Sequence, residues 1–333
     1  MNKVQLTAIQ NFIKEKKPAF LFGNGINLYN DSNSKTWREI LQDLLIDKIK
    51  DDCDLKFKFE RAFESDFSKD ISYPEMYDLI NGLYKIFGDD SDGELDCLQK
   101  EACDIIEGNF RKNKKNKHYK KIVEKLRNLN LPLMTTNFDN LFEKYSGLDK
   151  QNMKSLDQSV VGSGKYSAHF AYQWNKYFSD NTLTKPDEKF AIWHIHGTIY
   201  DSRSIQLGTN QYVGMLDRAR FAIRGKKGAA LSKSKEEWFA DNTWLDLMYN
   251  RPLVVIGLGV STDEIFLRWL LLGRNRHLTD FSNKVDRDEK HSLYLSSSEH
   301  PVPYAQRLFL ETCGFEIIEL STDKELYEDL WNY

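Results

Sequence analysis

The sequence predicts an α/β fold, a parallel sheet flanked by helices with a smaller helical lobe inserted. Several short apolar runs lie far apart in the chain, and each ends abruptly at small or polar residues. Continuous apolar runs are typical of strands buried on both faces of a parallel sheet. The segments between them carry apolar residues at helical spacing. The 333 residues suffice for one large domain, or for a core domain with a smaller lobe.

The first apolar run predicts a buried strand over Ala19–Phe22. Gly23 and Gly25 follow it and predict a tight turn whose backbone N–H groups are left bare. Such a turn at the carboxyl end of a parallel strand lets a diphosphate approach the main chain. Leu28 stands where the full dinucleotide fingerprint has a third glycine, so a plain strand-to-helix turn remains an open alternative.

A helical insertion is predicted over residues 36–128, between the first two sheet strands. Thr36 and Glu39 are suited to open a helix, and the rest of the segment is helical with breaks. Residues 111–121 (RKNKKNKHYKK) form a dense basic run. A solvated turn and helix start is one interpretation of this run, and a patch for nucleic acid or an acidic partner is the other.

Later strands are predicted over Leu131–Thr135, Phe190–Ile195, Leu253–Gly257, His291–Leu295 and Phe315–Leu320, with a short one over Ser204–Leu207. Residues 146–188 are predicted to be a loop-rich insertion, and 209–250 to be helices around a glycine-bearing loop. A helix is predicted over Thr262–Leu272. Asp263 and Glu264 would lie in its first turn, where the helix dipole favours acids.

Four of the apolar runs end in the clusters GNGIN, TTNFD, HIHG and GLGVS. In an open parallel sheet, ligands bind beyond the carboxyl ends of the strands. We therefore expect all four clusters to meet in one crevice. The two glycine-bearing turns are suited to cradle phosphates, and the other two clusters supply an amide, a carboxylate and an imidazole.

Each polar residue of these clusters also has a simpler interpretation. Asn137 and Asp139 are suited to cap the helix that follows them. Within a strand His194 and His196 point to the same face, which is compatible with a metal pair. His277, His291 and His300 do not lie at strand ends, so we expect no metal. His196, directly before Gly197, is better placed to reach a ligand, and His194 is expected to be a packed residue.

Composition excludes some functional classes. The chain has 47 basic and 50 acidic residues, so it is no polycation, although nucleic-acid binding is not excluded. Its mean hydropathy of −0.59 and the lack of a long uncharged apolar run argue against a membrane span. The N-terminal segment lacks the features of a signal peptide. Four cysteines without C-x-x-C spacing favour a reduced, cytoplasmic protein.

On these motifs the sequence resembles the SIR2 (sirtuin-like) superfamily, in particular the bacterial SIR2-like branch found in anti-phage defence proteins. The similarity extends over roughly residues 18–320. It implies a single SIR2-like domain over 1–333, a Rossmann-like NAD domain with a smaller inserted lobe. The residues that match the family's NAD-binding motifs are Gly23, Asn24, Gly25, Asn27, Thr136, Asn137, Asp139, His196, Gly257, Gly259 and Ser261.

The sequence also departs from the protein deacylases of the family. It has no four-cysteine zinc ribbon and no G-I-P-x-F-R segment, and Asn24 and Asn27 replace the usual Ala and Ser of the first loop. These departures weaken the case for a deacylase that acts on peptide substrates. The defence branch hydrolyses NAD+ to nicotinamide and ADP-ribose, so the resemblance implies an NAD+ hydrolase. The alternatives are an NAD-dependent deacylase or ADP-ribosyl transferase, and a non-catalytic NAD or ADP-ribose sensor.

The resemblance also implies roles for the site residues, with NAD+ as the substrate and no metal. Asn137 would hold the ribose or the attacking water, and His196 would be the general base. Asp139 would bind the nicotinamide carboxamide. The glycine turns and Ser261 would bind the diphosphate and adenosine half. Because an unrestrained NAD+ hydrolase harms its own cell, we expect gating by homo-oligomer formation or by a regulatory partner, such as an ATPase or a phage protein, through residues 36–128 or 111–121.

Overall fold

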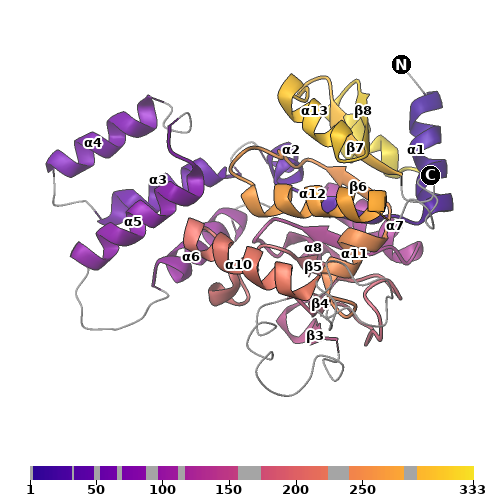
Figure 1. Ribbon diagram of the computed structural model, residues 1–333, viewed down its shortest axis with the longest axis horizontal. Coiled ribbons are helices and arrows are strands. Elements are labelled where there is room, and N and C mark those ends of the chain that lie inside the picture. Colours follow the sequence, from indigo (N-terminus) through magenta and orange to yellow (C-terminus); the bar gives the residue numbers. More distant parts are fainter. Residues whose placement is uncertain are drawn as a thin grey trace.

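The computed structural model describes residues 3–31, 34–48, 53–65, 70–87, 97–111, 117–156, 174–223, 240–280 and 291–333. Over these ranges the chain is α/β, with helices on both faces of one sheet (Figure 1). The predicted fold class is therefore confirmed. No helix in these ranges has both the length and the apolar character needed to cross a membrane.

The described sheet has eight strands in the order β3-β4-β5-β2-β1-β6-β7-β8. They are β1 (Ala19–Phe22), β2 (Leu133–Thr135), β3 (Met153–Ser155), β4 (Lys176–Phe178), β5 (Ile192–His194), β6 (Leu253–Ile256), β7 (Ser292–Ser297) and β8 (Phe315–Leu320). Six neighbouring strands are parallel, namely β5, β2, β1, β6, β7 and β8. At one edge of the sheet, β4 pairs antiparallel with β5, and β3 pairs antiparallel with β4. Numbered by their place in the chain, the parallel strands lie in the order 3-2-1-4-5-6, which is that of dinucleotide-binding sheets. The order reverses between β1 and β6.

The described helices are α1 (Lys3–Lys16), α2 (Gly25–Asn30), α3 (Trp37–Lys48), α4 (Cys53–Glu64), α5 (Tyr73–Phe87), α6 (Cys97–Arg111), α7 (Lys117–Asn128), α8 (Leu141–Ser146), α10 (Thr209–Ala222), α11 (Trp244–Asn250), α12 (Ile265–Asp280), α13 (Tyr304–Thr312) and α14 (Asp323–Tyr327). The side chains of successive β1 residues point to opposite faces of the sheet. Ala19 and Leu21 pack with α10, α11, α12 and α13. Phe20 and Phe22 pack with α1, α7, α8 and α14. Both faces are covered, which explains why β1 is apolar throughout.

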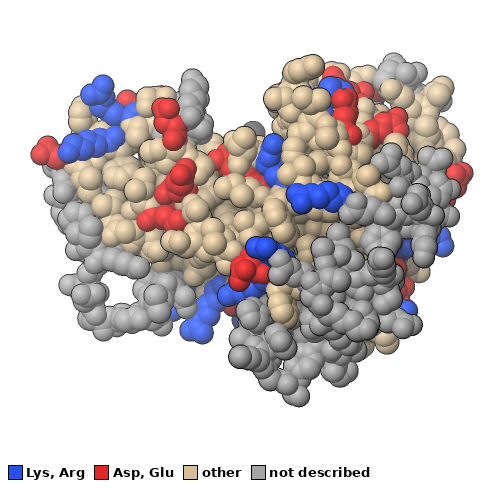
Figure 2. Space-filling view, viewed as in Figure 1, with Lys and Arg blue, Asp and Glu red and all other residues tan. Residues whose placement is uncertain are grey.

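A third hydrophobic cluster forms a separate helical lobe from α3, α4, α5 and α6. Figure 1 shows α3, α4 and α5 extending away from the sheet, with α6 closer to it, and Figure 2 shows the surface indented between the lobe and the sheet domain. The insertion was predicted to extend to residue 128, but α7 packs on the sheet through residues such as Tyr119 and Leu126, so the lobe's cluster ends with α6. The boundaries of the three predicted insertions otherwise stay a prediction.

One local expectation is wrong. Ser204–Leu207 is no strand: a short 3-10 helix covers Ser202–Ser204, and Ile205 and Leu207 pack into the lobe's cluster instead. The segment 146–188, predicted to be a loop-rich insertion, also contributes the short strands β3 and β4. Parts of the predicted insertions and of the basic run lie outside the described residues, namely 49–52, 66–69, 88–96, 112–116, 157–173 and 224–239.

Candidate active site

The register of the sheet brings the ends of its central strands to one level. Phe22, the last residue of β1, pairs with Thr135 of β2 on one side and with Ile256 of β6 on the other. Thr135 in turn pairs with His194, the last residue of β5. The four polar or glycine-bearing clusters that follow these strands therefore lie along one edge of the sheet, as expected for the carboxyl ends of parallel strands.

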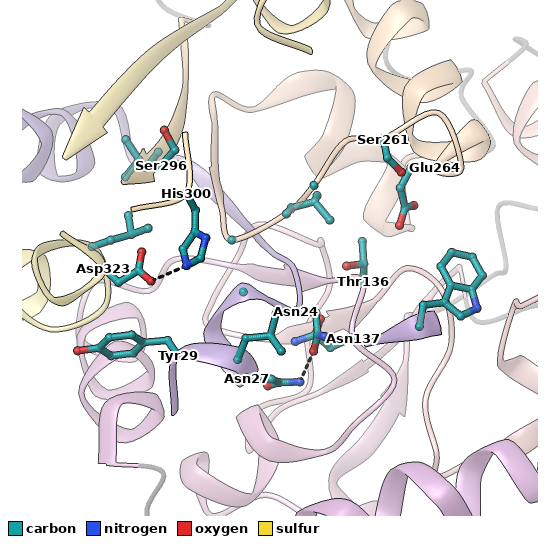
Figure 3. A pocket seen from close by; sticks show the side chains of 18 of the residues that line it. Asn24, Asn27, Tyr29, Thr136, Asn137, Ser261, Glu264, Ser296, His300 and Asp323 are labelled. Carbon is teal, nitrogen blue, oxygen red and sulfur yellow. Dashed lines mark hydrogen bonds and ion pairs between the residues drawn. The ribbon is translucent and has the colours of Figure 1, made fainter. Parts of the chain in front are cut away.

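A cavity of about 710 Å³ opens at this edge, at the point where the strand order reverses. Its volume is in the range of small-molecule sites. The predicted site residues that line it are Asn24, Gly25, Asn27, Thr136, Asn137, Asp139, His196, Gly257, Gly259 and Ser261. Gly23 does not line it. Figure 3 shows side chains from separate parts of the chain surrounding the cavity.

The two glycine turns pack against each other, and this corrects the prediction of bare N–H groups. The N–H of Gly23 donates to the Ile256 carbonyl at 3.0 Å, and that of Gly25 donates to the Gly257 carbonyl at 2.8 Å. A Cβ on Gly25 would lie 2.7 Å from the Gly257 Cα, and Gly257 itself has a φ of +62°. The glycines are needed because two backbone segments approach closely, and those two N–H groups are not free to bind a phosphate.

Asn27 joins the first turn to the second motif. Its Nδ2 donates to the Asn24 Oδ1 and to the Asp139 Oδ2, both at 2.8 Å, and its Oδ1 accepts from the Tyr119 hydroxyl. The other oxygen of Asp139 accepts the N–H of Leu141 at 3.0 Å, which is the helix-capping interpretation. Burial raises the pKa of Asp139. Asn27 has no amide hydrogen left for a ligand, so its role in this arrangement is to brace the cavity wall.

Asn137 is held from several sides. Its Nδ2 donates to the Gly23 carbonyl at 3.2 Å and its N–H donates to the Thr135 hydroxyl. Among the described residues no hydrogen bond engages its Oδ1, so this oxygen is left for a ligand. Its carbonyl accepts from the Nδ1 of His194 at 2.8 Å, and the Nε2 of His194 bonds Glu143 at 2.6 Å. Burial alone would lower the pKa of His194, but the charge and hydrogen bond of Glu143 outweigh it, so the pKa is raised.

His196 reaches the cavity from the end of β5. Its neighbour Gly197 has a φ of +95°, and a Cβ there would lie 2.1 Å from the Ser204 carbonyl oxygen, so only glycine fits. The His196 ring is 2% exposed and packs against Tyr212 and Phe266. Neither ring nitrogen makes a hydrogen bond to another described residue. Burial lowers the pKa of His196 to about 3.

The two histidines of the H-x-H motif do not share a face. β5 ends at His194, so strand alternation does not continue to His196. The His194 ring packs against Phe178, which belongs to the cluster on one side of the sheet, and the His196 ring packs against Phe266 from the other. The expectation of a shared face is wrong, and the geometry rules out a metal pair made by these two rings. In the part of the chain that the structure describes, no group of three or more His, Cys, Asp or Glu side chains is arranged to hold a metal ion.

Glu264 also lines the cavity, and its predicted position in the first turn of a helix is wrong. α12 begins at Ile265, so Asp263 and Glu264 precede the helix instead of lying in its first turn. The Oε2 of Glu264 is buried, has no hydrogen-bond partner, and lies 3.8 Å from the Nε2 of His196. Burial, with a smaller contribution from the charge of Asp263, raises the pKa of Glu264 to about 8. In Figure 3 its carboxylate points into the cavity.

The turn after β6 carries Gly259 and Ser261. A Cβ on Gly259 would meet no atom within 4 Å, so this glycine borders open space. The Ser261 hydroxyl donates to Asp263 at 3.3 Å, and Asp263 also accepts the N–H of Tyr73 from the helical lobe. This carboxylate therefore ties the lobe to the turn beside the cavity.

The opposite end of the cavity comes from segments that sequence reasoning missed. Ser296 lies at the end of β7, and its hydroxyl is buried without a hydrogen-bond partner. Asp323, after β8, accepts from the Ser297 hydroxyl and lies 3.3 Å from the Nε2 of His300. Figure 3 shows Ser296, His300 and Asp323 across the cavity from Ser261 and Glu264. Ligands bind beyond the carboxyl ends of parallel strands, so the ends of the predicted strands 291–295 and 315–320 already indicate these residues.

The helical lobe supplies a further wall. Trp37 stacks on Tyr73 with ring centroids 5.7 Å apart, and both line the cavity together with Lys35. Lys35 forms an ion pair with Asp43 and brings a positive charge to the wall. These residues lie beside the glycine turns only because the lobe folds there, and no sequence motif identifies them as cavity-lining residues.

The comparison with protein families agrees with this architecture. Residues 132–318, more than half of the chain, match the SIR2-like domain family. The match begins after the first glycine turn and includes the motifs that follow β2, β5 and β6. A search of curated proteins finds no match. With its dinucleotide-type strand order and the cavity at its switch point, the chain belongs to the SIR2-like domain family.

Proposed function

We propose that this protein hydrolyses NAD+ at the nicotinamide–ribose bond and releases nicotinamide and ADP-ribose. Membership of the SIR2-like family indicates an NAD-related activity in general. The observation that carries the finer proposal is the placement of Asn137 and His196. They follow the neighbouring strands β2 and β5, and both line the cavity at the switch point of the sheet.

The two ends of the cavity suit the two ends of the dinucleotide. Trp37 packs against Tyr212, which also packs against His196, so Trp37 and the stacked Tyr73 offer flat aromatic surface near His196, which favours the nicotinamide there. The free hydroxyl of Ser296 and the carboxylate of Asp323 favour the hydroxyl-rich adenosine half at the other end. In this proposal Lys35 exchanges its ion pair with Asp43 for the diphosphate, in place of the occupied N–H groups of the first glycine turn.

Cleavage of the glycosidic bond needs little acid catalysis, because nicotinamide leaves as a neutral molecule. The electron pair of the C1′–N1 bond goes to the nicotinamide nitrogen, and positive charge develops on the ribose, as in other glycoside hydrolyses. The Oδ1 of Asn137 is suited to face that charge or to orient the water. His196 takes a proton from the water as its oxygen bonds C1′.

Asp139 and Asn27 have a supporting role in this proposal. Both oxygens of Asp139 already accept hydrogen bonds from the protein. A carboxylate has further lone pairs, so a contact with the nicotinamide carboxamide stays a prediction. The bond from Asn27 fixes Asp139, and with it the segment that carries Asn137.

We further propose that the activity serves anti-phage defence in the cytoplasm and is gated by assembly or by a partner protein. Trp37, Tyr73 and Ile106 of the lobe line the cavity. A protein that binds the lobe would therefore act directly on the cavity wall. Light scattering that finds an active, unregulated monomer would contradict the gating.

The test is product analysis by mass spectrometry after incubation of the purified protein with NAD+ in ¹⁸O-labelled water, with and without candidate triggers. We expect nicotinamide and ADP-ribose labelled with one ¹⁸O. Asn137→Ala and His196→Ala should each lower the rate at least about 100-fold, as for a lost catalytic group. His291→Ala, which alters a half-exposed histidine paired with Glu316, is the control and should retain the wild-type rate. Full nicotinamide release from either site variant would refute the assignment, and O-acyl-ADP-ribose formed with acyl-lysine peptides would favour a deacylase.

A further inference from the structure

Two buried polar atoms face each other in the cavity without hydrogen-bond partners. They are the Nε2 of His196 and the Oε2 of Glu264, which lie 3.8 Å apart. Buried polar atoms in folded proteins are usually hydrogen-bonded, and here an acid and a base lie unpaired side by side at the cavity wall, each able to become the other's partner. The gap exceeds a hydrogen bond by about 1 Å, and a small movement of either side chain would close it.

The surroundings leave Glu264 no other ionic partner among the described residues. The Nη1 of Arg268, one turn further along, donates to the Val260 carbonyl, and its guanidinium stacks on Phe309. Asp263 is engaged by Ser261 and by the N–H of Tyr73, and its charge disfavours a second carboxylate nearby. On the other side the His196 ring packs against the aromatic rings of Tyr212 and Phe266.

The same surroundings fix where the proton resides. Burial lowers the pKa of His196 to about 3, and burial together with Asp263 raises the pKa of Glu264 to about 8. Near neutral pH the imidazole is therefore uncharged and the carboxyl group carries the proton. An imidazole with so low a pKa holds a proton poorly, whereas a carboxylate beside it would stabilise the imidazolium.

We propose that Glu264 is the positioning residue of His196 and that the two side chains form a catalytic dyad. In the reactive form Glu264 is a carboxylate and accepts the Nε2–H of His196. The Nδ1 is then free to take a proton from the water whose oxygen bonds C1′, while the C1′–N1 electron pair leaves with nicotinamide. The positive charge of the bound nicotinamide ring also favours the ionised carboxyl group. This inference rests on the proposed NAD+ hydrolysis.

The first test is the pH dependence of kcat/KM, which reports ionisations of the free enzyme. Because the reactive form lacks the Glu264 proton, kcat/KM of the wild type should rise with pH through a pKa of about 8. In Glu264→Gln this rise should disappear, and kcat/KM at pH 9 should fall at least about 100-fold. The matched control is Glu316→Gln, which alters another glutamate–histidine pair at the edge of the sheet, outside the cavity. It should retain both the rate and the pH profile.

The second test does not depend on turnover. Nitrogen NMR of the His196 ring in NAD-free protein should show a shift near pH 8 in the wild type, when Glu264 ionises, and none there in Glu264→Gln. A wild-type pH profile in Glu264→Gln, or identical ring titrations in both proteins, would overturn the dyad. A wild type that releases no nicotinamide under any condition would instead refute the proposed function, and the ring titration would still decide whether the two side chains are coupled.

Discussion

Replacing Gly25 by alanine tests whether the glycines of the first turn are needed for backbone packing. An added Cβ would lie 2.6 Å from the Tyr327 hydroxyl, 2.7 Å from the Gly257 Cα and 2.9 Å from the Gly257 oxygen. Two of these atoms are backbone and cannot rotate away. To move the Gly257 Cα from 2.7 Å to 3.4 Å, where ordinary contacts begin, the two turns must separate by about 0.7 Å.

The expected cost follows from that displacement. Overpacking of a well-packed region typically costs about 1–3 kcal/mol. Gly25→Ala should lie at the upper end, about 3 kcal/mol, because the shift also strains the 2.8 Å bond from the Gly25 N–H to the Gly257 carbonyl. Gly259→Ala is the matched control, since its Cβ would meet nothing within 4 Å. That variant should be as stable as the wild type, or up to about 1 kcal/mol more stable.

Urea-induced unfolding measures both variants, and calorimetric titration with ADP-ribose reports the cavity. Gly25→Ala should lower the unfolding midpoint and weaken ADP-ribose binding at least about tenfold, whereas Gly259→Ala should leave the midpoint unchanged or slightly higher. Equal midpoints for Gly25→Ala and the wild type would refute the packing argument. They would favour a direct role of the Gly25 backbone in ligand binding.

Two further predictions concern the groups behind the cavity wall. Glu143→Gln breaks a buried, hydrogen-bonded pair and should cost about 3–5 kcal/mol in urea unfolding at pH 6. The pair raises the folded-state pKa of His194 above 6.5, so its contribution to the free energy of unfolding is present below pH 6.5 and declines as pH rises through the raised pKa. The difference in unfolding free energy between the wild type and Glu143→Gln should therefore shrink toward pH 9. A difference that stays constant with pH would contradict the pairing. Asn27→Ala strips hydrogen bonds from the buried Asp139 and Tyr119 and should cost at least about 2 kcal/mol by the same measurement, whereas a loss below about 0.5 kcal/mol would show that Asn27 is no brace.

The sequence was sufficient to predict the sheet and the meeting of its strand ends. Ala19–Phe22 forms a strand with the predicted bounds, because a continuous apolar run in an α/β chain has few other ways to be buried. Phe315–Leu320 also has the predicted bounds, although it lies at the edge of the described sheet and only its two end residues are buried. The edge strands Met153–Ser155 and Lys176–Phe178 have three residues each and are defined by pairing with a neighbour. A local pattern does not reveal such strands.

The candidate site was predictable where residues follow a strand, and not where the tertiary structure decides their surroundings. Glu264 has the sequence context of a solvated acid at a helix start, and only the packing of its turn against His196 buries it. The bare N–H groups expected at Gly23 and Gly25 are bonded because the turn after β6 approaches them, and no pattern in either segment reports that approach.

A structure of the His196→Ala protein with NAD+ bound tests most directly whether this cavity holds the dinucleotide, since this variant should retain its substrate. The nicotinamide ribose should lie within about 4 Å of the Asn137 side chain, at hydrogen-bond or near-contact distance. The diphosphate should lie near Lys35, and the adenosine beside Ser296 and Asp323. NAD+ bound in the reverse orientation, or outside the cavity, would refute the proposed site.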